Sequence, residues 1–167
     1  MTETLTTSAL TADRFAPYGD VLEAVGEPTK WINQGMCGRH HDLAKMDFSD
    51  GKAGISFFNA QPRPLPGKVD LVERHPDGSQ AFIPLLQTSF LVVVADDDNG
   101  TPVNLQAFLT KPGQGINLYR NVWHGVLSPL EAPGLFAVID RIGDGPNLEE
   151  FWFETPIGVE AGEEKST

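Results

Sequence analysis

The stretch ERHPDGSQAFIPL, Glu73 to Leu85, carries the strongest structural signal in the chain. Glu73 and His75 stand two residues apart, the spacing that places side chains on one face of a β-strand. The residues PDGS at 76–79 are typical of a tight turn, because Pro fixes φ, Asp caps the turn and Gly tolerates a positive φ. A second strand then opens with Gln80. We therefore predict a hairpin with a carboxylate, an imidazole and an amide on one face.

A second stretch, KPGQGINLYRNVWH from Lys111 to His124, adds a further imidazole. A lone histidine beside Trp123 is more often a packing residue with a satisfied hydrogen bond than a ligand, so His124 does not indicate a site by itself. If His124 arrives from another strand, it joins Glu73, His75 and Gln80 in a polar cluster inside a β-barrel. Buried polar groups cost free energy unless they are paired or used, so such a cluster predicts a functional site.

Turn residues punctuate the whole chain, since its 17 Gly and 13 Pro are spread along it and gathered in no linker. With the β-branched and aromatic runs LVVVA and LFAVID, this favours an all-β barrel or jelly roll with minor helical turns. One helical turn is expected over Ala12–Tyr18, where Thr11 is an N-cap candidate, and a weaker one over Asn99–Gln106. The predicted strands are Gly19–Ala24, Gly54–Ala60, Lys68–Arg74, Gln80–Leu85, Ser89–Ala95, Asn104–Thr110, Ile116–Tyr119, His124–Leu127 and Leu135–Ile142.

The length of 167 residues predicts a single domain over 1–167, with about 155–167 as a flexible polar tail. The net charge of −11 argues against nucleic acid and anionic membranes as partners. A small anionic substrate stays compatible with it, because arginines reverse the field inside a pocket. The chain has no apolar run of membrane-spanning length, no signal sequence and one cysteine, Cys37, which we interpret as an inert thiol. These features predict a cytoplasmic location.

Arginine is the expected anchor for a substrate carboxylate, because its planar guanidinium matches that group. Arg120 is the first candidate, since it lies four residues before His124 and would share its strand parity. Arg141, at the end of the LFAVID strand, Arg39 and Arg74 are further candidates.

The spacing Glu73-x-His75-x4-Gln80, followed by a Pro-Gly turn and Trp123-His124, resembles the two motifs of the cupin barrels, with two residues of the first motif exchanged. The resemblance implies a cupin-like double-stranded β-helix, or jelly-roll barrel, with Glu73, His75, Gln80 and His124 at the metal-ligand positions. One Glu and two His suit a divalent ion, whereas a Gln carbonyl is a weak ligand. A carboxylate beside an imidazole works equally as a metal-free acid/base pair, so both chemistries stay open.

The same motifs, with GRHHDLA at 38–44, ISFFNAQPRPLP at 55–66 and VIDR at 138–141, resemble the ureidoglycolate lyases of allantoin degradation. The similarity covers about residues 10 to 145. It implies a homodimeric carbon–nitrogen lyase that splits (S)-ureidoglycolate into glyoxylate and urea, with a divalent metal, usually nickel. The family commonly has a second histidine after Trp-His, where this chain has Gly125.

Cleavage of ureidoglycolate needs a base for the hydroxyl proton and an acid for the departing urea nitrogen. We expect Glu73, His75 and His124 to share these roles, and the substrate to meet Gln80, Trp123 and an arginine. Two rival interpretations are another metal-dependent cupin enzyme acting on a small polar acid and a non-catalytic cupin that binds a small ligand.

Overall fold

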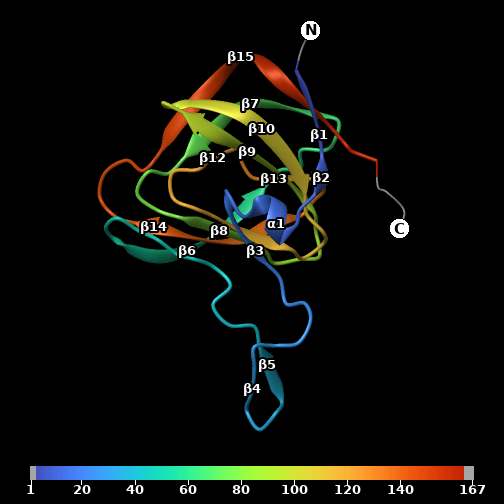
Figure 1. Cartoon of the computed structure of the whole chain (residues 1–167), viewed down its shortest axis with the longest axis vertical. Helices are drawn as coiled ribbons and strands as arrows, with labels where there is room; N and C mark the ends of the chain where they lie inside the picture. Colours follow the sequence, from blue (N-terminus) through green and yellow to red (C-terminus); the bar gives the residue numbers. More distant parts are fainter. Residues whose placement is uncertain (1–2, 164–167) are drawn as a thin grey trace.

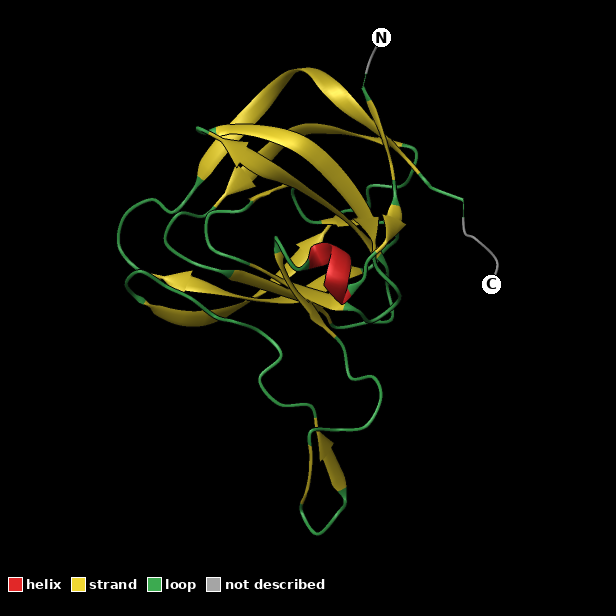
Figure 2. Cartoon of the chain, viewed as in Figure 1, coloured by secondary structure: helices red, strands yellow, loops and turns green. Residues whose placement is uncertain are grey.

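The computed structural model describes residues 3–163 and confirms the all-β prediction (Figures 1 and 2). An eight-stranded sheet faces a five-stranded sheet, and the larger sheet curls toward a barrel. The predicted helical turn forms as α1 (Ala12–Phe15), where the Thr11 hydroxyl accepts a hydrogen bond from the Arg14 amide at 3.4 Å. No helix among the described residues is long and apolar enough to cross a membrane.

The larger sheet has the strand order β1-β15-β7-β12-β9-β10-β2, with β13 also paired to β9. Its strands are β1 (Thr4–Thr6), β2 (Ser8–Ala9), β7 (Gly67–Arg74), β9 (Phe90–Asp98), β10 (Thr101–Leu109), β12 (Trp123–His124), β13 (Ser128–Pro129) and β15 (Glu149–Glu160). The smaller sheet has the order β3-β11-β8-β14-β6. Its strands are β3 (Gly19–Leu22), β6 (Lys52–Ala60), β8 (Gln80–Pro84), β11 (Gly115–Leu118) and β14 (Gly134–Ile142).

Strand β9 lies at the centre of the core because it is buried on both faces. Phe90, Val92 and Val94 pack between the two sheets, against Phe136 and Val138 of β14. The alternate residues of β9 belong to a second apolar cluster inside the curled sheet, with members such as Leu91, Val93, Ala95, Ala107, Trp123 and Val159. The LVVVA run therefore has the two-sided burial that its sequence predicts.

The predicted hairpin from Glu73 to Leu85 is wrong in one respect. Strand β7 pairs with β12 and β15, whereas β8 pairs with β11 and β14, so the Pro-Asp-Gly turn passes from one sheet to the other. An isolated bridge between Phe48 and Gly78 holds this turn. As a result, the end of β7 and the start of β8 belong to facing sheets at the same end of the molecule.

Three further expectations need correction. The helical alternative over Asn99–Gln106 is wrong: Asn99 and Gly100, both with positive φ, turn the chain, and β10 follows. Strand β12 has two residues and ends at His124, short of the predicted Leu127. The expected flexible tail is replaced by β15 as far as Glu160, because β15 pairs with β7 and β1; residues 164–167 of that tail lie outside the described range.

A separate two-stranded hairpin, β4 (Lys30–Ile32) and β5 (Cys37–Arg39), projects from the body of the molecule, beyond the smaller sheet (Figure 1). Trp31 and Met36 are exposed on it. The sequence patterns did not predict this arm.

Candidate active site

Pairing of β12 with β7 places His124 directly opposite Glu73. His124 is also the register partner of Val94, which packs between the sheets, so its side chain faces the smaller sheet. His75 follows just beyond β7. Ligand atoms of Glu73, His75 and His124 all lie within 4.8 Å of one another, and the two imidazole centroids are 5.2 Å apart. The structure therefore brings together the three ionisable residues among the four singled out by the motifs.

Both imidazoles are oriented by backbone carbonyls. The Nδ1 atom of His75 lies 2.7 Å from the carbonyl oxygen of Asn147, and that of His124 lies 3.0 Å from the carbonyl oxygen of Gly125. Because a carbonyl only accepts, each Nδ1 carries the hydrogen and each neutral ring keeps its lone pair on Nε2. Both Nε2 atoms are buried without a hydrogen-bond partner in the described structure. Two unsatisfied acceptors beside a carboxylate form a site prepared for a ligand.

Burial sets the charge state of the cluster. It lowers the pKa of His124 to about 3, with a further contribution from the nearby charge of His75, so His124 is neutral at pH 7. Burial also raises the pKa of Glu73, partly opposed by His75 and reinforced by the negative charge of Glu150. His75 and Glu73 are in close proximity, with Nε2 3.9 Å from Oε1. A carboxylate with a raised pKa beside an imidazole is suited to proton transfer.

Gln80 opens β8 in the facing sheet, and its side chain is buried. Its Nε2 donates to the Asp140 carboxylate at 3.1 Å, while its Oε1 is buried without a partner. The Asp140 carboxylate fixes the orientation of the Gln80 amide. In the flipped orientation, Oε1 of Gln80 would face a carboxylate oxygen, and two acceptors form no hydrogen bond. Gln80 therefore offers an acceptor for an N–H group.

Arg120 lies in the turn between β11 and β12, so the strand parity predicted for it with His124 is wrong. The turn nevertheless adjoins the cluster, since the Asn121 amide donates to the His75 carbonyl at 2.9 Å. The Arg120 guanidinium is partly exposed, and its Nε lies 3.7 Å from an exposed Asp47 carboxylate. Such a loose, solvated ion pair is easily exchanged for a substrate carboxylate.

The structure does not bring the other four predicted substrate contacts to the cluster. Arg74 alternates with Glu73 on β7 and forms ion pairs with Asp97 at 2.9 Å and Glu149 at 2.6 Å. Arg141 pairs with Asp50 and donates to the Asp144 carbonyl at 2.8 Å. Arg39 lies on the projecting arm. Trp123 alternates with His124, so it packs inside the curled sheet, where its Nε1 donates to Asp97 at 2.8 Å.

Sequence reasoning missed Asp140 and Asn147. Asp140 precedes Arg141 in the chain, and alternation along β14 puts their two side chains on opposite faces of the sheet. Asn147 acts on His75 through its carbonyl, and its side chain accepts from the Asp77 amide at 2.7 Å. A backbone contact of this kind leaves no residue-type signal in a sequence.

The donor set fits a divalent metal ion. Two imidazole nitrogens and one carboxylate suit first-row transition metals, and ligating histidines usually donate their other N–H to a carbonyl or carboxylate. The unpartnered Nε2 atoms and the carbonyl-bound Nδ1 atoms of His75 and His124 match that arrangement. Glu73, His75 and His124 thus form a cluster that could hold a metal ion.

Comparison with known proteins assigns the chain to a family. A family model described as ureidoglycolate lyase matches residues 2–160. The chain belongs to the ureidoglycolate lyase family. The ureidoglycolate lyase of Rhodobacter capsulatus is 58% identical over 159 residues, 95% of this chain and 99% of that protein. The ureidoglycolate lyase of Chelativorans sp. is 48% identical, over 90% of this chain and 92% of that protein. The ureidoglycolate lyase of Agrobacterium fabrum is 47% identical, over 95% of this chain and 97% of that protein.

In this member of the ureidoglycolate lyase family, Gly125 is held by its amide, which donates to the Val93 carbonyl at 2.8 Å. A Cβ at position 125 would lie 3.3 Å from the Val93 Cβ, so a larger side chain needs β9 to give way. The cluster has its three ligand atoms together without a histidine at this position.

Proposed function

We propose that this protein is a ureidoglycolate lyase that cleaves (S)-ureidoglycolate to glyoxylate and urea, a reaction of allantoin degradation. Two findings support the proposal: family membership over nearly the whole chain, and a cluster with acid/base capacity. The observation that carries it is the convergence of Glu73 with two imidazoles whose Nε2 atoms have no partner.

The substrate carbon bears a hydroxyl group, a carboxylate, a hydrogen and the urea nitrogen. We propose that Glu73 takes the hydroxyl proton as the carbonyl forms and the C–N bond breaks. The proton passes from Glu73 to the free lone pair on Nε2 of His75 across their 3.9 Å separation and from there to the departing urea nitrogen, which returns His75 to its starting state. His124, neutral because it is buried, accepts a hydrogen bond from the substrate.

The remaining groups of the substrate have complementary partners. The Gln80 Oε1, oriented by Asp140, accepts from a urea N–H. Arg120 exchanges Asp47 for the substrate carboxylate, which the loose geometry of that ion pair supports. Arg120→Gln should therefore chiefly raise KM, whereas Arg39→Gln on the arm serves as a matched control.

As the alternative to this metal-free proton transfer, we propose a divalent metal, nickel by family resemblance, held by Glu73, His75 and His124, whose ligand atoms would then not act as acid or base. A bound ion supplies Lewis acidity, which polarises oxygen atoms of a ligand. The fit of the donor set supports this part of the proposal.

The protein is further proposed to act as a cytoplasmic homodimer. The outer face of the smaller sheet supports a dimer, because Ile55 and Phe57 on β6 are each 72% exposed. Ile83 of β8, and Leu85 one residue beyond its end, extend the same apolar face through β14. Large exposed apolar patches commonly mark interaction surfaces. Light scattering should give a dimer mass for the parent and a smaller mass for Phe57→Lys.

The direct test is glyoxylate release from racemic and single-enantiomer ureidoglycolate by the purified protein. Glu73→Gln and His75→Gln should abolish most turnover, whereas the exposed controls Glu131→Gln and His41→Gln should retain it. Absence of glyoxylate release by the parent, with folding confirmed by circular dichroism, would reject the assignment. Parent-like turnover in both cluster variants would move the chemistry elsewhere.

A further inference from the structure

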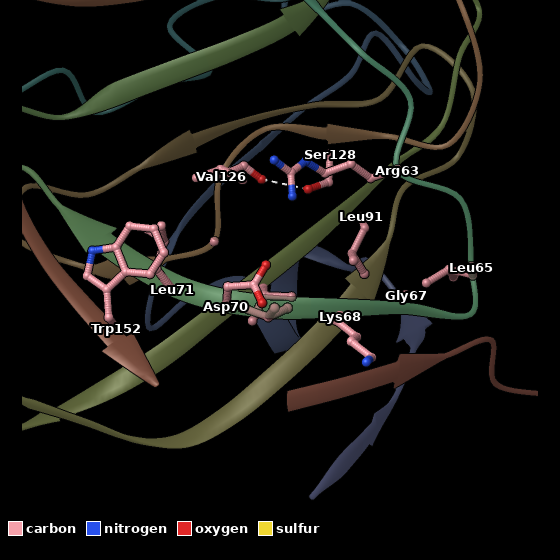
Figure 3. A pocket seen from close by; sticks show the side chains of 13 residues that line it. Arg63, Leu65, Gly67, Lys68, Asp70, Leu71, Leu91, Val126, Ser128 and Trp152 are labelled. Atoms are coloured by element: carbon pink, nitrogen blue, oxygen red, sulfur yellow. Dashed lines mark hydrogen bonds between the residues drawn. The ribbon is translucent and has the colours of Figure 1, made fainter. Parts of the chain in front are cut away.

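A cleft lies on the other side of the curled sheet from the cluster. Figure 3 shows the residues that line it. Strand β12 ends after two residues, so β7 and β9 separate beyond it and leave a gap. The cleft occupies this gap and encloses about 150 Å³. Its floor includes Gly125 and Val93, and Val93 belongs to the apolar cluster inside the curled sheet. The ring of His124, in contrast, faces the smaller sheet, so the two sites are separate.

The walls of the cleft are mainly apolar. Leu71 and Leu91 line it, and Trp152 stands at its edge with 62% of its surface exposed. The Trp152 indole nitrogen donates to Glu150 at 3.2 Å, which constrains the ring. Apolar cavities of about 150 Å³ hold ligands the size of benzene. The cleft thus has the size and lining for one small ring or a short branched chain.

The side chains that line the cleft carry an excess of positive charge. Arg63 and Lys68 line the cleft, and neither forms an ion pair within the described residues. The Arg63 amide donates to the Pro129 carbonyl at 2.7 Å, which anchors this residue beside the cleft. Asp70 is the one acidic lining residue, in a chain whose net charge is −11. In the view of Figure 3, Arg63 lies on one side and Lys68 and Asp70 on the other. A local excess of cations in an acidic protein attracts anions.

We propose that this cleft binds a small organic anion with an apolar body. Its carboxylate lies between Arg63 and Lys68, and its ring or branched chain packs on Leu71 and Trp152. Ureidoglycolate, glyoxylate and urea have no such apolar body, so the ligand is neither substrate nor product of the proposed reaction.

The test uses benzoate as the probe and benzamide as its neutral counterpart. In ¹H–¹⁵N spectra, benzoate should shift the Trp152 indole and Gly125 amide signals in a saturable manner, and benzamide should bind at least about tenfold more weakly. The double variant Arg63→Gln/Lys68→Gln should lose benzoate binding by at least about tenfold, while Lys111→Gln, an exposed lysine elsewhere, should retain it. Turnover of ureidoglycolate should be unchanged in both.

Equal binding of benzoate and benzamide would overturn the proposal, as would benzoate binding retained in the double variant. Shifts confined to Glu73 and His124 would assign the anion to the cluster instead. Absence of any shift on addition of benzoate would also overturn the proposal. If light scattering then gave a monomer mass for Trp152→Glu and a dimer mass for the parent, a second copy of the chain would cover the cleft. Because turnover is measured separately, failure of this proposal leaves the proposed lyase function intact.

Discussion

Replacement of Glu73 by glutamine should reduce activity and increase stability at the same time. Glu73 is the one carboxylate among the three clustered residues, and an amide of nearly equal size cannot take a proton. General acid–base groups contribute about 10²–10⁴-fold to rate, so kcat should fall by that factor, equivalent to about 2.7–5.4 kcal/mol. Initial rates of glyoxylate formation at saturating substrate measure this loss.

The stability effect has the opposite sign because burial raises the pKa of Glu73. A carboxyl group whose folded-state pKa exceeds its unfolded value stabilises the fold while protonated, and that stabilisation is lost as pH rises through the folded pKa. At pH 7 the parent therefore holds a desolvated carboxylate that Glu73→Gln removes. Melting temperatures of chelator-treated protein should be higher for the variant at pH 7, with the difference shrinking as pH falls.

Glu150→Gln is the matched control for this reasoning. Glu150 is the register partner of Glu73 on β15, and its charge contributes to the raised pKa of Glu73. Its removal should lower that pKa, so the acid limb of the kcat profile should move to lower pH without loss at the optimum. An acid limb that stays in place, or a Glu73→Gln variant with parent kcat, would refute the role assigned to Glu73.

Three further predictions concern the supporting structure. Asp140→Asn removes the carboxylate that orients the Gln80 amide, so KM should rise by roughly two- to tenfold in steady-state kinetics. This factor corresponds to the loss of one hydrogen bond of about 0.5–1.5 kcal/mol. An unchanged KM would exclude Gln80 as a substrate contact. Phe136→Ala should cost about 3–5 kcal/mol, seen as a melting temperature lower by roughly 6–20 °C, because Phe136 is fully buried between the sheets. Chelation should remove the bound metal detected by elemental analysis and lower the activity, and one divalent ion should restore both. Glu73→Gln should bind that ion more weakly than the parent. Equal metal content in the variant and the parent would contradict the ligand set.

Several structural features were predictable because they depend on neighbours in the chain. The two-sided burial of β9 follows from its continuous apolar run, and the α1 cap follows from Thr11. The two-residue spacing predicted that Glu73 and His75 share one side of a strand, whereas the meeting with His124 was implied by the resemblance to the cupin motifs. Gln80 was singled out for the same reason, but the orientation of its amide required Asp140 from another strand.

Other features depended on pairing between distant segments. Residues 73–85 have the spacing of a hairpin, yet β7 and β8 belong to different sheets. The reason is that β7 pairs with β12 and β15, whereas β8 pairs with β11 and β14. The sequence does not distinguish the arginine candidates, but their surroundings do. Arg120 forms a loose ion pair with Asp47, and Arg39 lies on the exposed arm. Arg141 forms a close ion pair with Asp50.

The amino-acid sequence by itself determined the all-β class, the chemical types at the cluster and their local spacing, since these follow from turn chemistry and a two-residue side-chain period. Tertiary structure alone decided that Glu73 faces His124, that two carbonyls leave both Nε2 atoms free, and that a second cleft opens where β12 ends. The physical reason is that strand register and desolvation arise from contacts between segments far apart in the chain, and local periodicity carries no information about which segments meet.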